Sequence, residues 1–415
     1  MNRTALPQLR RRRLAALAVL AVLAASGAVW GAPAAFADTV VDPTACSAPG
    51  PGGGNGTITG TSAYTLDGGT QAFADRLFTA DDTNETAVLV SNGGTLSLLR
   101  PTVVTSGNTE SADDSSFYGL NAAVRATETG SGISIRGGSI TTTGSGANAL
   151  HAEYNGSITM TGGRINVSGQ FAHPVLVSHN GSAVLRDVDM VSTACHGSVV
   201  ATDQGDGTVD VYGGRLLATG KYSTVLYATG TITAHRVRGV SKADNAVVMA
   251  GTTTTVLADH SDLTGAEDGV QGFAMGASSN TLTVRGGSIT AEGGPVFDFS
   301  GGTTVINVSD GAKLRSATDQ LVTVAGGGTV TLSASDTRLE GTITGAALAL
   351  SDGAAWSSPA DSALTAVTGL RVRGGEAHGI TSAHTVTYDA SLAANAYLGG
   401  RAYALAGGGT LTPAS

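Results

Sequence analysis

The sequence of 415 residues is poor in cysteine and in charge, and both shortages exclude classes of protein. Its two cysteines, Cys46 and Cys195, provide no zinc-binding or haem-binding spacing. Cys46 lies too far beyond the N-terminal apolar segment to be the lipid-bearing cysteine of a bacterial lipoprotein. Only 13% of the residues are charged, and the net charge of −9 argues against nucleic acid and anionic membranes as partners, since both bind basic faces.

The N-terminus has the pattern of a cleavable signal peptide over residues 1–37. The run Arg10 to Arg13 precedes an apolar stretch from Leu14 to Leu23, and Ala35-Phe36-Ala37 fits a cleavage site. The mature chain is then expected to start at Asp38 without a transmembrane segment. A transmembrane anchor is the competing interpretation, but the apolar stretch is short and rich in alanine. The arginine run also permits a twin-arginine export route.

The residues that are abundant favour an all-β protein. Glycine accounts for 60 residues, and threonine, serine, valine and alanine fill much of the rest, which is typical of strands and tight turns. A hydrophobic content of 41% argues against disorder because it is enough to form a core.

A unit of about 25 residues recurs along the chain and predicts stacked coils. Residues 132–144 (GISIRGGSITTTG) and 157–169 (SITMTGGRINVSG) show its plan, in which alternating apolar residues flank a Gly-Gly bend. A third short apolar segment follows in most repeats, so each coil is expected to contain three strands. Stacking would place aliphatic residues of successive coils on top of one another. The first apolar column is Leu96, Ile133, Ile158, Ala183, Val209, Ile232, Val256, Leu282, Val305 and Val330; the second is Val103, Ile140, Ile165, Met190, Leu216, Gly239, Leu263 and Ile289.

Glycine and asparagine mark the turns between these strands. The pairs beginning at Gly137, Gly162, Gly213 and Gly286 occupy one place in the repeat, where a positive φ is expected. Asn155, Asn180 and Asp206, each followed by glycine, form a second turn column in which the left-handed region is tolerated. A calcium-binding β-roll would instead need a nine-residue period with repeated aspartate, and neither occurs.

The repeat predicts a single parallel β-helix of about 11–13 coils, with residues 38–90 as N-terminal cap and first coils, 91–350 as the main helix and 351–415 as C-terminal coils and cap. The step from Leu96 to Ile133 is longer than the others, which predicts an insertion near residues 108–118. Cys46 and Cys195 are expected to be isolated thiols, because the repeat places them many coils apart. An exported protein would still permit a bridge between them.

The signal pattern, the Gly/Thr/Val coils of 23–26 residues and the low aromatic content together resemble the passenger region of bacterial autotransporters of the pertactin-like kind. The resemblance spans about residues 55–411, and residues 389–411 look like the last strands of such a passenger. It implies a right-handed parallel β-helix of the pectin-lyase-like type. The chain departs from the family because it stops at Ser415 without an outer-membrane barrel, so a separate outer-membrane translocator is a possible partner.

The same fold includes polysaccharide-acting lyases and hydrolases, which need clustered carboxylates. Asp113-Asp114 and His196 are about three coils apart, too far to cooperate, and are interpreted as solvated and turn residues. The other seven histidines share no column, and Asp259, Asp262, Glu267 and Asp268 are interpreted as a solvated turn. No catalytic residue, metal site or cofactor is therefore predicted.

The leading hypothesis is an exported, non-catalytic interaction protein at the cell surface, outside the cell or in the periplasm, with a polysaccharide lyase or hydrolase as the alternative. The insertion supplies the candidate binding residues Phe117, Tyr118, Asp113 and Asp114, because an aromatic pair beside acids suits a contact point. The competing interpretation is that these aromatic rings fold back onto the coil. Expected partners are a host or bacterial surface protein or a glycan.

Overall fold

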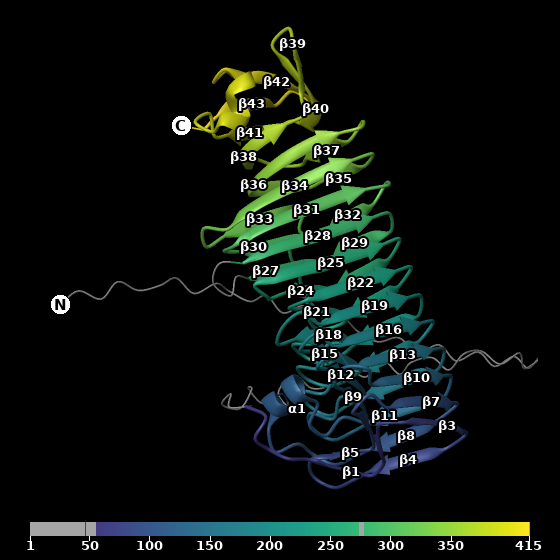
Figure 1. Ribbon diagram of the computed structural model, residues 1–415. Helices are drawn as coiled ribbons and strands as arrows, with labels where there is room; N and C mark the ends of the chain where they lie inside the picture. Colours follow the sequence, from purple (N-terminus) through teal and green to yellow (C-terminus); the bar gives the residue numbers. More distant parts are fainter. Residues whose placement is uncertain (1–45, 47–54, 274–277, 415) are drawn as a thin grey trace, which may run out of the picture. The chain divides into compact units, whose positions relative to one another are not determined.

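The structure is a computed structural model that describes residue 46 and residues 55–273 and 278–414, all within one compact unit, Thr39–Ser415. The predicted signal peptide, residues 1–37, and its cleavage site lie outside the described residues. Figure 1 shows that the unit is a stack of coils, and each coil hydrogen-bonds to the next. It forms a right-handed parallel β-helix of about 14 turns, slightly more than the 11–13 expected.

Each regular coil contributes one strand to each of three faces, as predicted. We call them the first, second and third face in chain order. The first face consists of β3 Thr70–Ala74, β7 Thr95–Leu99, β10 Gly132–Arg136, β13 Ser157–Thr161, β16 Ser182–Arg186, β19 Thr208–Tyr212, β22 Thr231–His235, β25 Thr253–Asp259, β28 Ser279–Arg285, β31 Thr303–Ser309 and β34 Thr329–Ser335.

The second face is a ten-stranded parallel sheet. It consists of β4 Leu77–Ala80, β8 Thr102–Thr105, β11 Ser139–Thr142, β14 Arg164–Val167, β17 Asp189–Ser192, β20 Arg215–Ala218, β23 Arg238–Ser241, β26 Asp262–Gly265, β29 Ser288–Ala291 and β32 Lys313–Ser316.

The third face joins the first at β36, which pairs with both β33 and β34. The third face consists of β2 Thr65–Asp67, β6 Val88–Ser91, β9 Val124–Thr127, β12 Leu150–Glu153, β15 Val175–Ser178, β18 Val200–Asp203, β21 Leu226–Ala228, β24 Val247–Met249, β27 Val270–Phe273, β30 Phe297–Ser300 and β33 Gln320–Ala325.

The remaining elements lie at the two ends and in the insertion. They are β1 Thr61–Ser62, β5 Glu85–Thr86, α1 Ala112–Tyr118, β35 Arg338–Glu340, β36 Thr342–Ser351, β37 Ala355–Ser358, β38 Ser362–Thr368, β39 Arg371–Arg373, β40 Glu376–Ser382, β41 Thr385–Tyr388, the 3-10 helix η2 Ala393–Leu398, β42 Tyr403–Ala406 and β43 Thr410–Pro413. The strand pairs β39–β40 and β42–β43 are antiparallel.

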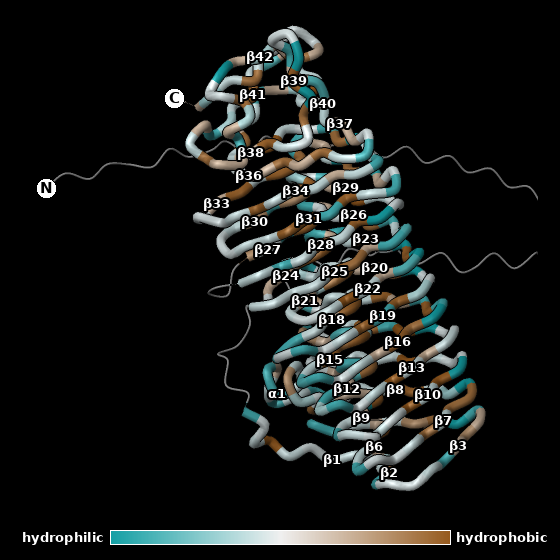
Figure 2. The backbone as a smooth tube through the Cα atoms, turned by 45° about the horizontal axis from the view of Figure 1, so that its top comes forward, coloured by the Kyte–Doolittle hydropathy of each residue, from teal (hydrophilic) through white to brown (hydrophobic). Residues whose placement is uncertain are grey.

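The predicted columns are the rungs of the core. Ile133 pairs with Ile158 and with Leu96, and Ile140 pairs with Ile165. Figure 2 shows hydrophobic segments that recur along the strands of successive coils, whereas the turns are mainly polar. The buried aliphatic residues form one continuous core, and a fully buried side chain of this kind contributes about 1.5–3 kcal/mol before chain entropy is counted.

The first column was wrong in its last two members. Leu282 pairs with Ile306, which pairs with Leu332, so the neighbouring Val305 points outward and is 38% exposed. Strands alternate their side chains between the two sides of a sheet, and a shift of one residue therefore exchanges core for solvent. Gly239 is accommodated in the second column because Val225 fills the space that a side chain there would occupy.

The predicted Gly-Gly turns all have positive φ, but the second turn column needs a correction. In the coil of β12, both Tyr154 and Asn155 are left-handed, and the next coil repeats this with His179 and Asn180. In the third coil the left-handed residues are Gln204 and Gly205 rather than Asp206. Large aromatic side chains thus share the turns with asparagine.

Cys46 and Cys195 form a disulfide with a Cα–Cα distance of 5.7 Å, so the prediction of isolated thiols was wrong. That prediction counted coils between the two residues. Cys46, however, precedes the first coil and lies beside the coil of Cys195. Ten residues further on, the Gly56 amide donates to the Asp114 carboxylate of α1 at 2.9 Å.

The first coils end in an aromatic cluster. Tyr64, Phe73 and Phe78 meet edge to face with ring centroids 5.6–6.1 Å apart. The Arg76 guanidinium lies 4.1–5.0 Å from all three ring centroids, an arrangement favoured by the negative faces of aromatic rings. Arg76 thus covers the apolar rings at the start of the stack, where no earlier described coil lies against them.

Candidate binding surface on the third face

The predicted insertion forms the short helix α1, which lies against the third face (Figure 1). The Ser111 hydroxyl caps its start by accepting from the Asp114 amide, and Gly119 ends it in the left-handed conformation. Its carbonyls then bind the coils beneath. The Phe117 carbonyl accepts from the Ser178 hydroxyl at 2.7 Å and lies 3.0 Å from the His179 Nδ1.

The structure brings the four predicted binding residues together on α1, but the helix is folded against the coil. Asp114 is buried, which corrects the interpretation of the acid pair as solvated. Asp113, Phe117 and Tyr118 are half-buried. The Tyr118 ring stacks on His179 at 5.2 Å, so this ring folds back onto the coil, in line with the competing interpretation. The binding role of these four residues stays a prediction.

A buried polar cluster lies beneath the end of α1, and no sequence pattern indicated it. The Arg125 Nε donates to the Glu153 carboxylate at 2.8 Å, and the Glu153 and His151 side chains are completely buried. Gly119 lies directly above, where a Cβ would be 2.5 Å from the His151 ring. Burial and the charge of Arg125 hold the pKa of His151 well below its usual value, so the imidazole is neutral.

Ser178, His151 and Glu153 have the composition of a catalytic triad but not its geometry. A triad needs the acid on one ring nitrogen of histidine and the hydroxyl on the other. Here the Ser178 hydroxyl at 3.3 Å and a Glu153 oxygen at 4.0 Å both face Nε2, while Nδ1 has no hydrogen-bond partner among the described residues. The cluster therefore serves the docking of α1 rather than nucleophilic catalysis.

Two columns of stacked rings border the third face, and each contains one histidine among tyrosine or phenylalanine rings. Tyr118, His179 and Tyr154 form one column, with centroids 5.2 and 4.7 Å apart. Phe171, His196 and Tyr222 form the other, at 5.0 and 4.7 Å. The signal was present in the 25-residue step from Tyr154 to His179 and in the 25- and 26-residue steps from Phe171 to His196 and Tyr222, although it mixes histidine with phenylalanine and tyrosine.

A hollow of about 280 Å³ lies beside the second ring column. We call it the third-face hollow. Its lining is Phe171, His173, Leu176, His196, Ser198, Ala201, Asp203, Tyr222 and Tyr227. Leu176, Ala201 and Tyr227 come from neighbouring strands of the third face, at successive places of one outward column. The hollow therefore has a floor of stacked strands and a wall of rings.

Burial shifts the pKa values of the polar groups that line the third-face hollow. Burial raises the pKa of Asp203 to about 6, against a hydrogen bond from the Gln204 amide. It also raises the pKa of Tyr227 to about 12 and lowers that of His173 to about 4. The His173 Nδ1 lies 2.9 Å from the Ser198 carbonyl, which can only accept, so Nδ1 carries the proton and Nε2 is an acceptor. At pH 7 the hollow offers an anionic carboxylate, a phenol and a neutral imidazole.

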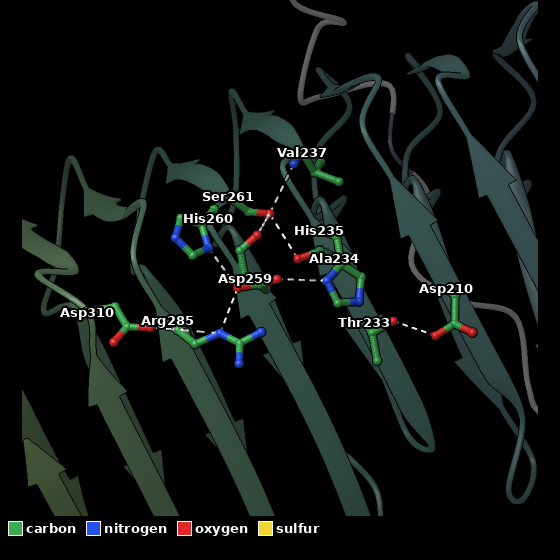
Figure 3. A network of polar contacts seen from close by, with 10 residues as sticks. All are labelled: Asp210, Thr233, Ala234, His235, Val237, Asp259, His260, Ser261, Arg285 and Asp310. Atoms are coloured by element: carbon green, nitrogen blue, oxygen red, sulfur yellow. Dashed lines mark hydrogen bonds and ion pairs between the residues drawn. The ribbon is translucent and has the colours of Figure 1, made fainter. Parts of the chain in front are cut away.

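A second polar network lies on the outer side of the first face (Figure 3). Asp259 accepts from the Arg285 Nε at 2.8 Å and contacts His235 at 3.0 Å and His260 at 2.8 Å. These contacts, the one with Arg285 first, hold the pKa of Asp259 far below its usual value. The nearby Ser261 hydroxyl bonds to backbone groups, donating to the Ala234 carbonyl. The Asp259 carboxylate is therefore paired with Arg285 and the two histidines, and the Ser261 hydroxyl is engaged with the backbone, so neither group is available as a nucleophile.

Asp268 lies in a third acidic group and is buried, as is Asp259, which corrects their interpretation as members of a solvated turn. Burial, with Asp298, Glu267 and Asp244 nearby, raises the pKa of Asp268 to about 6. In the described residues, no group of three or more His, Cys, Asp or Glu side chains is placed to hold a metal ion.

Asp268→Asn is expected to raise the free energy of unfolding at pH 7.5 by about 1–3 kcal/mol. A raised carboxyl pKa gives stability that is fully present below the unfolded pKa of 3.8 and is lost as the pH rises through about 6. The gain should therefore shrink on acidification and disappear near pH 4. Urea denaturation at several pH values measures it, with the exposed Asp206→Asn as control. An equal effect at pH 7.5 and pH 4 would contradict the assignment.

No helix in the described part of the chain is long and apolar enough to cross a bilayer. Searches against family models, curated proteins and solved structures gave no match.

Proposed function

We propose that the chain is an exported, non-catalytic β-helix interaction protein that binds a glycan in the third-face hollow. The observation that carries the proposal is the convergence there of Asp203, Tyr227 and His173 on an apolar floor beside a wall of stacked rings. Binding sites commonly combine an apolar lining with a few converging polar groups. A carboxylate, a phenol and an imidazole suit the alternating donors and acceptors of sugar hydroxyls.

Export and surface display are supported by two independent features. Disulfides persist in oxidising compartments, and the Cys46–Cys195 bridge fits one. The N-terminal pattern of residues 1–37 fits a secretory signal. The resemblance to autotransporter passengers is compatible with display at the cell surface and with a separate translocator.

A polysaccharide lyase or hydrolase is the second candidate, favoured by the fold type alone. Glycoside hydrolysis requires two carboxylates flanking the scissile bond. Asp203 is the one carboxylate among the described residues that line the third-face hollow. The buried Glu153 is paired with Arg125 beneath α1 and is not available to a substrate.

Tyr227→Phe is expected to weaken glycan binding about three- to tenfold, because it removes one hydroxyl that faces the hollow. Binding is measured with a panel of neutral and acidic oligosaccharides of three to six sugars, followed by titration of those retained. Asp203→Asn should reproduce the loss of affinity that wild type shows below pH 6.

Tyr397→Phe is the matched control, because it removes a hydroxyl from η2, which lies near the C-terminal end of the described coils and does not line the hollow. Binding that is equally reduced in Tyr397→Phe, or unaffected in Tyr227→Phe and Asp203→Asn, would refute the proposed site. Hydrolysis of an oligosaccharide by wild type would contradict the non-catalytic role and favour the hydrolase.

A further inference from the structure

The ladder of the second face stops at β32, which creates a hollow elsewhere on the molecule. Among the described strands, β32 pairs with β29 only, and the strand of the next coil, β35, pairs with β37. The turn before them is still closed, because the Gly311 amide donates to the Asp336 carbonyl at 2.9 Å and the Thr337 hydroxyl to the Ala312 carbonyl at 3.0 Å. Beyond that turn the two strands have no ladder between them. A hollow of about 590 Å³ lies there, which we call the second-face hollow.

Three cationic side chains face the second-face hollow. Lys313 and Arg315 alternate with the buried Leu314 on β32 and are therefore on its outer side. Arg338 begins β35, and the bond between Thr337 and Ala312 places it beside Lys313 on the neighbouring coil. Like charges on adjacent rungs repel one another.

No ion pair compensates these cations in the described part of the chain. Lys313, Arg315 and Arg338 have no carboxylate within 4.0 Å, although the chain as a whole carries an excess of acid. Asp336 and Glu340 also line the hollow, and Glu340 follows Arg338 by two residues on the same strand. The acids thus lie beside Lys313 and Arg338 without neutralising either by direct contact.

We propose that the second-face hollow binds an oxyanion, the sulfate or phosphate group of a ligand, between Lys313 and Arg338, with Arg315 as a third contact. An oxyanion there would replace the repulsion between the two cations by charge-assisted hydrogen bonds. The guanidinium groups offer planar paired donors that match such groups, and the ammonium adds a point charge. The open rim supports access, since a Cβ built on Gly311 or Gly353 would meet no atom within 4 Å.

The site is independent of the proposed glycan site, because it lies on another face and shares no lining residue with the third-face hollow. The two sources of an oxyanion are a free inorganic ion and an ester carried by a larger molecule. A larger molecule would extend over the outer side of β29 and β32. Its other groups would then contact Ser288 and Thr290, which precede Lys313 and Arg315 in the outward columns.

The test is isothermal titration calorimetry of the full mature chain with three probes, namely inorganic sulfate, inorganic phosphate and a sulfated disaccharide, at an ionic strength fixed with sodium chloride. We expect saturable binding of at least one probe with one site per chain. The double variant Lys313→Gln/Arg338→Gln should lose affinity by at least about tenfold. Tighter binding of the disaccharide than of the free ions would assign the site to an esterified ligand.

The control is Arg371→Gln/Arg373→Gln, which removes the same charge from the exposed strand β39. It should bind as wild type does, and both double variants should keep the melting temperature of wild type. An equal loss of affinity in the two double variants would show that net charge alone causes the effect, and the proposed site would be refuted. Absence of saturable binding for all three probes would overturn it as well.

Discussion

Arg125→Ala is expected to lower the free energy of unfolding by about 3–5 kcal/mol, one of the largest effects of any single replacement in this chain. The Glu153 side chain is completely buried, and Arg125 is the cation that neutralises it. Removal of the guanidinium would leave a carboxylate without water and without a partner. Chemical denaturation measures the loss, and hydrogen exchange should show that α1 opens first, because α1 covers this cluster.

The matched control is Arg100→Ala, which breaks an ion pair between exposed side chains. Arg100 and Asp75 contact at 2.7 Å, but both are more than half exposed, so the change in the free energy of unfolding should be far smaller than that of Arg125→Ala. A double replacement, Arg125→Met with Glu153→Met, should recover most of the loss because no buried charge remains. Similar costs for Arg125→Ala and Arg100→Ala would contradict the importance of burial.

Gly144→Ala is expected to cost about 3 kcal/mol or more, although its φ is not positive. A Cβ at this position would lie 1.8 Å from the carbonyl oxygen of Gly107 in the preceding coil. Gly169 repeats the arrangement one coil later, against the carbonyl oxygen of Gly144. The three nearest atoms are all backbone atoms of Ser106 and Gly107, so the clash cannot be relieved by the movement of a flexible side chain. Thermal and chemical denaturation measure the effect.

Gly132→Ala is the control for this replacement, because it lies in the same coil and its Cβ would have an ordinary contact of 3.4 Å with the Ser157 hydroxyl. It should change stability little, since alanine also reduces the freedom of the unfolded chain. If Gly144→Ala proves equally mild, the coils can separate locally more easily than their contacts indicate.

The regular part of the fold could be predicted from the sequence because its determinants are local and repeated. Rungs such as Ile133 on Ile158 follow from a period that each coil restates. The prediction became wrong at β31 and β34, the last two strands of the first column. In β31 the sequence Thr-Thr-Val-Ile-Asn-Val offers two adjacent aliphatic residues, and apolar character alone does not decide which one faces the core.

The disulfide and the docking of α1 could not be predicted by the same argument because neither follows the period. Cys46 precedes the first coil, so its position in the stack is not fixed by counting repeats. The helix α1 depends on a carbonyl at Phe117 that meets Ser178 two coils later. Such contacts join a segment that lacks the 25-residue repeat to one that has it.

The third-face hollow was missed for a different reason. Its floor residues Leu176, Ala201 and Tyr227 occupy one outward column, but their chemistry changes from coil to coil. A search for identical residues at a fixed step overlooks such a column. The rings of Phe171, His196 and Tyr222 would have appeared if histidine had been grouped with the aromatic residues.

The three rings under Arg76 imply that unfolding of the coils starts at the N-terminal end of the stack. In a linear array, each unit is held by two neighbours except at the ends, where one interface is missing. At the far end, β42 and β43 fold onto each other as a hairpin and close that boundary with hydrogen bonds. Among the described residues, the near boundary is covered by the Arg76 guanidinium, which lies over three aromatic rings. Fraying under heat or denaturant should therefore begin at β2, β3 and β4 and advance coil by coil towards the C-terminus.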